Sequence, residues 1–137
     1  MKKQILILGA VLIGSLAFLS MTVIKTDVQD TWEVPSKYQK MKNPYATVAD
    51  SDNIGRIMYS KHCKSCHGTK GKGDGNKAAN LDTPVGDFTD GSLKDQTDGS
   101  LYYKSFIGRD DMPSFQKKIT DEEDQWQLIN YLRKLSE

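Results

Sequence analysis

The 137-residue chain is poor in arginine and has no long run of basic residues. Arginine occurs only as Arg56, Arg109 and Arg133, and the formal net charge is +1. Proteins that bind nucleic acid need a basic surface, so no nucleic-acid partner is predicted. Cysteine and histidine are equally scarce, with two of each, and all four lie within residues 62–67.

One apolar run interrupts the otherwise polar composition. Residues 5–24 carry no charge, and as a helix they would span about 30 Å, the hydrocarbon thickness of a bilayer. A secretory signal usually has a shorter apolar region that ends at a small-residue cleavage site, which this run lacks. We therefore predict that residues 1–24 form an uncleaved, single-span anchor in a bacterial cytoplasmic membrane, with a cleaved signal sequence as the alternative. Lys2 and Lys3 would stay cytoplasmic, which puts the rest on the periplasmic or extracytoplasmic side.

Residues 25–50 are predicted to be a linker. They mix prolines, lysines and aspartates without a helical or strand period. A flexible chain of this length would reach about 86 Å when fully extended. It contains three aromatic residues, more than a spacer needs: Trp32, Tyr38 and Tyr45. We expect these rings to pack on the folded domain or to lie at the membrane interface.

Residues 51–137 are predicted to form a small all-α domain with three main helices. Each helix has a recognisable end signal, either an N-cap, a capping box or a C-terminal glycine. These signals are Ser51 or Asp52 before the first helix, Gly108 after a helix over 98–107, and Thr120 with Glu123 before the third. The region 68–96 shows no sustained strand pattern and is a long loop for so small a domain. The core is thin, so the domain needs a large apolar group at its centre.

The sequence Cys63-Lys64-Ser65-Cys66-His67 is the attachment motif of c-type haem. Thiols three positions apart lie on one side of a helical turn, where both can add to the vinyl groups of one porphyrin. His67 then presents its Nε2 atom to the iron. A zinc site built from His62, Cys63, Cys66 and His67 would be strained, and a thioredoxin-like pair would open a helix rather than follow one. We predict one covalent haem c.

The second axial ligand is predicted from the methionines. His62 cannot reach the opposite face of the haem, which leaves a methionine, a lysine, water or an empty position. Met112 lies just after a predicted helix and before Pro113, which favours an extended backbone and lets the side chain project across a cavity. We therefore predict that His67 and Met112 are the axial ligands of the haem iron.

On these residues the chain resembles the class I cytochrome c family, over about residues 51–135. Gly55 and Tyr59 resemble the family's glycine and aromatic residue where its first and last helices cross, and Tyr131 resembles the aromatic residue that packs there from the last helix. The resemblance implies the small cytochrome c fold, with long loops wrapped around one haem.

The loop after the motif also resembles that of many bacterial members. Its Gly71, Gly73 and Gly75 are expected to allow positive φ and a close approach of the backbone to the haem. The family usually has a proline about a dozen residues after the axial histidine, whose carbonyl accepts the ring N–H. No proline stands at that place here, and Pro84 is the expected substitute.

The resemblance implies an electron carrier with no catalytic residues. The expected role is electron transfer in a respiratory chain on the exported side of the membrane. Its redox partners would be a quinol-oxidising complex or dehydrogenase and a terminal oxidase or reductase. The alternatives are a fixed cytochrome c subunit of a membrane oxidoreductase complex and a gas-binding haem sensor, which would require Met112 not to bind the iron.

Overall fold

The structure, a computed structural model, describes residues 32–137, so the predicted anchor lies outside the described residues. Within this part the regular elements are helical and no strand occurs, as expected for the all-α domain. No helix of this part is long and apolar enough to cross a membrane. The helices are α2 (Ser36–Gln39), α3 (Ile54–His62), α4 (Lys64–His67), α5 (Asp98–Phe106) and α6 (Glu122–Leu135), with two 3₁₀ turns, η1 (Ala78–Asn80) and η2 (Phe88–Asp90).

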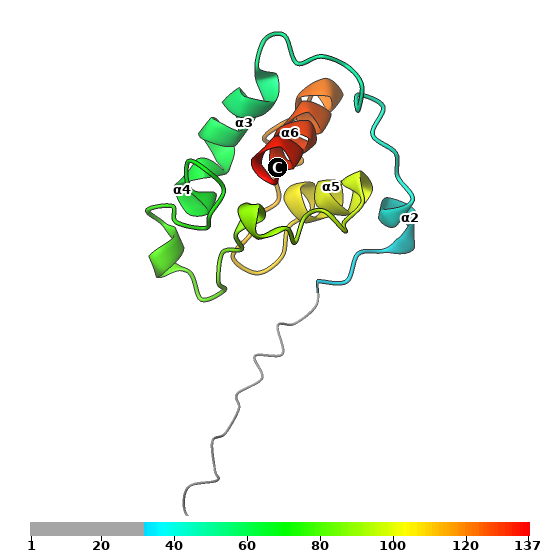
Figure 1. Cartoon of the computed structure of the whole chain (residues 1–137). Coiled ribbons are helices and arrows are strands. Elements are labelled where there is room, and N and C mark those ends of the chain that lie inside the picture. The colour runs from blue at the N-terminus through cyan, green and yellow to red at the C-terminus, as the bar shows by residue number, and fades with distance from the viewer. Residues whose placement is uncertain (1–31) are drawn as a thin grey trace, which may run out of the picture. The chain divides into compact units, whose positions relative to one another are not determined.

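Helix α6 lies between α3 and α5 (Figure 1) and contributes four of the twelve buried residues in the core of the described part. Its apolar face buries Trp126, Leu128 and Ile129 almost completely. On the α5 side, the ring of Tyr102 lies 4.7 Å from that of Trp126, and its hydroxyl donates a hydrogen bond of 2.6 Å to Gln125. Apolar burial and a satisfied polar group therefore fix α5 against α6 together.

The predicted crossing of the first and last helices of the domain is confirmed. A Cβ atom on Gly55 would lie 2.1 Å from the carbonyl oxygen of Gln127 and 2.9 Å from the Cβ atom of Tyr131. Only glycine permits this approach of α3 to α6. One turn later, the rings of Tyr59 and Tyr131 pack with centroids 5.3 Å apart and planes at 50°.

The start of α3 differs from the prediction. The capping carboxylate belongs to Asp50, which accepts hydrogen bonds from the backbone N–H groups of Ile54 at 2.6 Å and Gly55 at 3.0 Å. Neither Ser51 nor Asp52 occupies this role. The turn just before the helix places Asp50 over its first free N–H groups, where a negative charge also complements the helix dipole.

The start of α6 is shifted by one residue. Asp121 is the N-cap, and its side chain accepts hydrogen bonds from the backbone N–H groups of Glu123 and Asp124. The predicted cap was Thr120. Helix α5 ends as predicted, since Gly108 has a φ of +75° just beyond its C-cap residue.

Residues 33–50, here called the strap, pack on the domain. Tyr38 and Tyr103 contact each other with ring centroids 4.7 Å apart. A Cβ atom on Gly99 would lie 1.9 Å from the carbonyl oxygen of Tyr38, so the strap backbone touches α5 directly. Helix α2 of the strap accordingly lies beside α5 in Figure 1.

Side-chain amides fasten the second half of the strap. The amide nitrogen of Asn43 donates to Asn130 on α6 at 2.8 Å and to Asp98 on α5 at 3.3 Å. Asn130 in turn donates to the carbonyl oxygen of Tyr45 at 2.9 Å. The compact unit therefore runs over Glu33–Glu137. Residues 33–50, which were predicted to belong to the linker of 25–50, are part of this unit.

A single arginine ties the loop before α5 to the last helix. Arg133 donates hydrogen bonds to the Asp98 carboxylate at 2.9 Å and to the carbonyl oxygens of Leu93 and Gln96. The planar guanidinium has donors for all three acceptors at once. This contact holds the end of the long loop in place where no regular element does.

The helix crossing gives a first prediction. Gly55→Ala is expected to lower the free energy of unfolding by about 1–3 kcal/mol or more, because the new methyl group would overlap a backbone carbonyl that cannot move aside. Gly86→Ala is the matched control, since nothing lies within 4 Å of a Cβ atom there. Denaturant unfolding of both variants measures the difference. Equal stabilities would show that the crossing is looser than the structure indicates.

Candidate haem site

Cys63 joins two helices, as the last turn of α3 runs into α4. The backbone N–H groups of Cys66 and His67 both bond to the carbonyl oxygen of Cys63, at 3.1 Å and 3.0 Å. This hydrogen bonding makes the motif one helical turn, as the sequence predicts. Both cysteines are free thiols rather than a disulfide, and burial raises the pKa of Cys63 to about 12, with Cys66 adding to the effect.

The glycine-rich loop folds back over this turn. The N–H of Gly73 bonds to the carbonyl oxygen of His67, and that of Gly75 bonds to the carbonyl oxygen of Cys66, both at 3.0 Å. Gly71 and Gly73 have positive φ, as expected. Gly75 is needed for a different reason: the loop backbone passes so close to α4 that a Cβ atom at this position would lie 2.5 Å from the carbonyl oxygen of Cys66. The free carbonyls at the end of α4 are thereby satisfied without a longer helix.

His67 lies in an apolar environment. Burial lowers the pKa of its imidazole to about 4, so the ring is neutral at pH 7, the form that binds iron. Its Nδ1 atom is buried and has no hydrogen-bond partner among residues 32–137. The expected acceptor, the carbonyl of Pro84, does not bond to it. Instead, the ring stacks on Phe88, with centroids 4.5 Å apart and planes at 24°.

Sequence reasoning missed Phe88. It is the only aromatic residue between 68 and 96, a region otherwise rich in glycine, aspartate, asparagine and lysine. An isolated aromatic residue in such a loop was the available signal, because a large apolar side chain there needs a buried partner.

Met112 lies in a tight turn after α5. Its backbone N–H bonds to the carbonyl oxygen of Arg109 at 2.8 Å, and the two residues form an isolated bridge. Met112 is half-buried and packs against the core cluster that contains Cys63. Three residues later, Phe115 meets the ring of His62 edge-on, with centroids 5.8 Å apart. Through this ring contact, the segment after Met112 reaches the end of α3, next to the cysteine motif.

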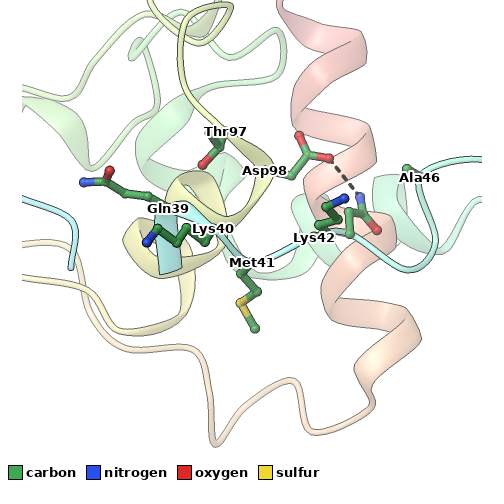
Figure 2. A pocket seen from close by; sticks show the side chains of 8 residues that line it. Gln39, Lys40, Met41, Lys42, Ala46, Thr97 and Asp98 are labelled. Atoms are coloured by element: carbon green, nitrogen blue, oxygen red, sulfur yellow. Dashed lines mark hydrogen bonds between the residues drawn. The ribbon is translucent and has the colours of Figure 1, made fainter. Parts of the chain in front are cut away.

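A shallow hollow lies elsewhere on the domain. It is lined by the strap residues Gln39, Lys40, Met41, Lys42, Asn43 and Ala46 together with Thr97 and Asp98. Figure 2 shows Lys40 and Lys42 on either side of Met41, whose side chain points away from Thr97 and Asp98. None of the predicted haem-site residues lines this hollow, so it is not the haem site.

The residues present fit a covalent haem better than a metal ion alone. The thiols of Cys63 and Cys66, which form no disulfide, and the neutral imidazole of His67 suit a porphyrin at this turn. In the part of the chain that the structure describes, no three His, Cys, Asp or Glu side chains are grouped to hold a metal ion. The zinc alternative therefore has no geometric support here.

Comparison with protein families agrees with this chemistry. The family model described as cytochrome c matches residues 51–136, more than half of the chain. The chain belongs to the cytochrome c family. Cytochromes c bind a c-type haem covalently, and Cys63, Cys66 and His67 of this chain form the CxxCH motif that they use. Haem-based electron transfer is the activity that such a domain implies.

A solved structure shows a similar fold. It is a chain of the reducing HAO-like protein complex Kustc0457/Kustc0458 from Kuenenia stuttgartiensis, with 25% identity and a TM-score of 0.58. The match covers 71% of this cytochrome c chain but 50% of that protein, so this chain spans about half of its relative. No significant match is found among curated proteins.

Tyr59 offers a test of how the loop is held against the motif. Its buried hydroxyl donates a hydrogen bond of 2.7 Å to the carbonyl oxygen of Gly68, the residue after His67. Tyr59→Phe leaves that carbonyl unsatisfied and is expected to cost about 1–3 kcal/mol in the free energy of unfolding. The control is Tyr131→Phe, which removes a hydroxyl from the other ring of the pair and keeps the Gly68 bond. Thermal and denaturant unfolding compare the two, and an equal loss would contradict this role of Tyr59.

Proposed function

We propose that this chain is a class I cytochrome c with one haem, which carries electrons on the exported side of a bacterial cytoplasmic membrane. Cys63 and Cys66 form the thioether bonds, and His67 and Met112 are the axial ligands. When bound, the haem supplies a one-electron Fe(III)/Fe(II) couple. The observation that supports the proposal is the edge-on contact of Phe115, three residues after Met112, with His62, which directly precedes the cysteine motif.

The chain's own residues favour electron transfer over catalysis. Two side-chain ligands leave no coordination position for a substrate, so the centre exchanges electrons and binds nothing new. Burial keeps water from Cys63 and from Nδ1 of His67, and a neutral His67 that holds its proton on Nδ1 would offer Nε2 to the iron. No catalytic acid or base is needed.

The strap supports attachment to the membrane. If residues 1–24 are the anchor, only residues 25–32 separate it from the domain, and these eight residues extend over about 29 Å at most. The strap carries three exposed lysines, Lys37, Lys40 and Lys42, against two carboxylates at its ends, of which Asp50 caps α3. Each lysine near an anionic lipid surface adds about 1 kcal/mol of attraction. A short tether and a basic strap both favour a domain that works close to the membrane.

The redox partners would then be neighbouring membrane proteins, a quinol-oxidising complex or dehydrogenase as donor and a terminal oxidase or reductase as acceptor. A fixed place in an oxidoreductase complex is the second candidate. It is favoured by the similarity to a chain of the HAO-like complex, which is a two-protein assembly by its description. Purification from native membranes separates the two, since a fixed subunit leaves the membrane with its partners.

The axial ligation can be tested by spectroscopy. Met112→Ala is expected to keep the covalent haem but to lose the methionine-to-iron charge-transfer band of the oxidised protein and to lower the reduction potential, because a methionine ligand raises it. Met41→Ala is the matched control, since Met41 is 37% exposed on the strap. Unchanged spectra in Met112→Ala, or rapid binding of carbon monoxide to the reduced wild-type protein, would favour a gas-binding haem.

The membrane proposal has its own test. Full-length chain expressed in a host that attaches haem c is expected to stay in the membrane pellet after extraction with alkaline carbonate, because the apolar run of 5–24 spans the bilayer. A chain in which residues 5–24 are replaced by a cleavable signal sequence is the control and should appear in the soluble fraction. If expression of the full-length chain instead yields a soluble protein that begins after residue 24, the N-terminal segment is a cleaved signal sequence.

A further inference from the structure

We propose that Phe88 is the positioning residue of the axial histidine, fixing the plane of the His67 imidazole by stacking where a carbonyl hydrogen bond would otherwise do so. The inference rests on the proposed ligation by His67 and adds to it the group that orients the ligand. It concerns residues of this chain alone.

The first step is the missing hydrogen bond. A histidine that binds a metal usually donates its other ring N–H to a carbonyl, carboxylate or water, which fixes the ring and makes it a stronger donor. In this structure Nδ1 of His67 is buried and has no carbonyl or carboxylate acceptor within residues 32–137. The protein therefore orients the ring through another contact.

The second step is the ring contact itself. Phe88 lies nearly parallel to the imidazole, with planes at 24° and centroids 4.5 Å apart. Aromatic pairs in this geometry contribute about 0.5–1.5 kcal/mol beyond their buried area. Rotation of His67 about its Cβ–Cγ bond would turn the imidazole edge into the phenyl face, so the stack restricts that rotation.

The third step is the rigidity of Phe88. Its backbone N–H bonds to the carbonyl oxygen of Gly71 at 2.7 Å, and a Cβ atom on Gly71 would lie 3.0 Å from its ring. The 3₁₀ turn η2 that carries it is capped by Asp87, which accepts hydrogen bonds of 2.7 Å from both the N–H and the hydroxyl of Thr89. Phe88 is thus held on both sides, by the glycine loop and by its own turn.

Two consequences follow for the haem centre. The imidazole plane is set by Phe88, so the orientation of the ligand relative to the porphyrin depends on this ring. A histidine without a hydrogen-bond acceptor at Nδ1 is also the weaker electron donor, which favours the reduced iron. Phe88 touches the ligand and not the iron, so it acts by positioning.

The test compares Phe88→Leu with Phe88→Tyr in the full-length, haem-loaded protein. We expect Phe88→Leu to keep the covalent haem and the low-spin spectrum but to change the order and spread of the haem methyl resonances and to broaden the EPR signals, because the imidazole is free to rotate. Phe88→Tyr restores a stacking ring and should reproduce the wild-type pattern. Both spectra report the plane of the axial imidazole, which a merely structural role would not alter.

Phe106→Leu is the matched control for loss of stability. Phe106 is fully buried and packs on Tyr102, with ring centroids 4.7 Å apart, so the same substitution there should destabilise the domain and leave the haem methyl pattern unchanged. Wild-type methyl resonances and EPR signals in Phe88→Leu would overturn the inference while the proposed function stands. A wild-type protein that lacks low-spin haem would overturn both.

A measurement on the wild-type protein avoids the risk that a variant fails to fold. In the reduced, diamagnetic protein, the Nδ1–H proton of His67 is expected to show no scalar coupling to a carbonyl carbon. A resolved coupling would identify a hydrogen-bond acceptor, and the ring would then be oriented by that bond and not by Phe88.

Discussion

The close approach of α3 to α6 at Gly55 is the constraint on which the rest of the domain depends. With no side chain at this position, the two backbones meet, and the rings of Tyr59 and Tyr131 pack one turn further on. The direction of α3 is thereby fixed, and the cysteine motif lies at its end. A small shift at the crossing would be carried along α3 to the residues that hold the haem.

The proposed haem site is built from segments with little regular structure, each fixed by local hydrogen bonds. The glycine loop closes on α4, η2 is capped by Asp87, and the methionine turn is closed by the contact between Arg109 and Met112. A prosthetic group that supplies a large apolar surface would compensate for the small core of such a domain. The helices fix the position of the CxxCH turn, and the loops around it would contact the haem.

Much of this could be read from the sequence, because the decisive signals are local. The CxxCH turn, the glycine after α5 and the region of each main helix depend on neighbours a few positions apart. The crossing residues Gly55, Tyr59 and Tyr131 were instead predicted from the family resemblance. The helix starts were misplaced by one or two residues, since several candidate caps stand side by side at 50–52 and 120–121. The packing of Tyr38 and Tyr45 on the domain was one of two expectations, and the structure confirms it. Phe88 was missed, and residues 33–50 were assigned to the linker, because their partners are distant in the chain and leave no periodic pattern. The prediction that the carbonyl of Pro84 accepts the Nδ1–H of His67 was also wrong. The position of a carbonyl in a loop depends on the geometry of the whole loop, which the presence of a proline does not determine.

The strap has a consequence for the order in which the chain folds. Asn43 and Asn130 are 87 residues apart, and Asn43 and Asp98 are 55 apart. Contacts of such sequence separation form slowly, because a long loop must close first. The strap leaves the ribosome early, but Asn43 and Tyr45 meet Asn130 only when the last helix has been made. These contacts are therefore expected to form late. Because no strap residue is fully buried, they are also expected to open early, so protected amides in the strap would report a complete domain.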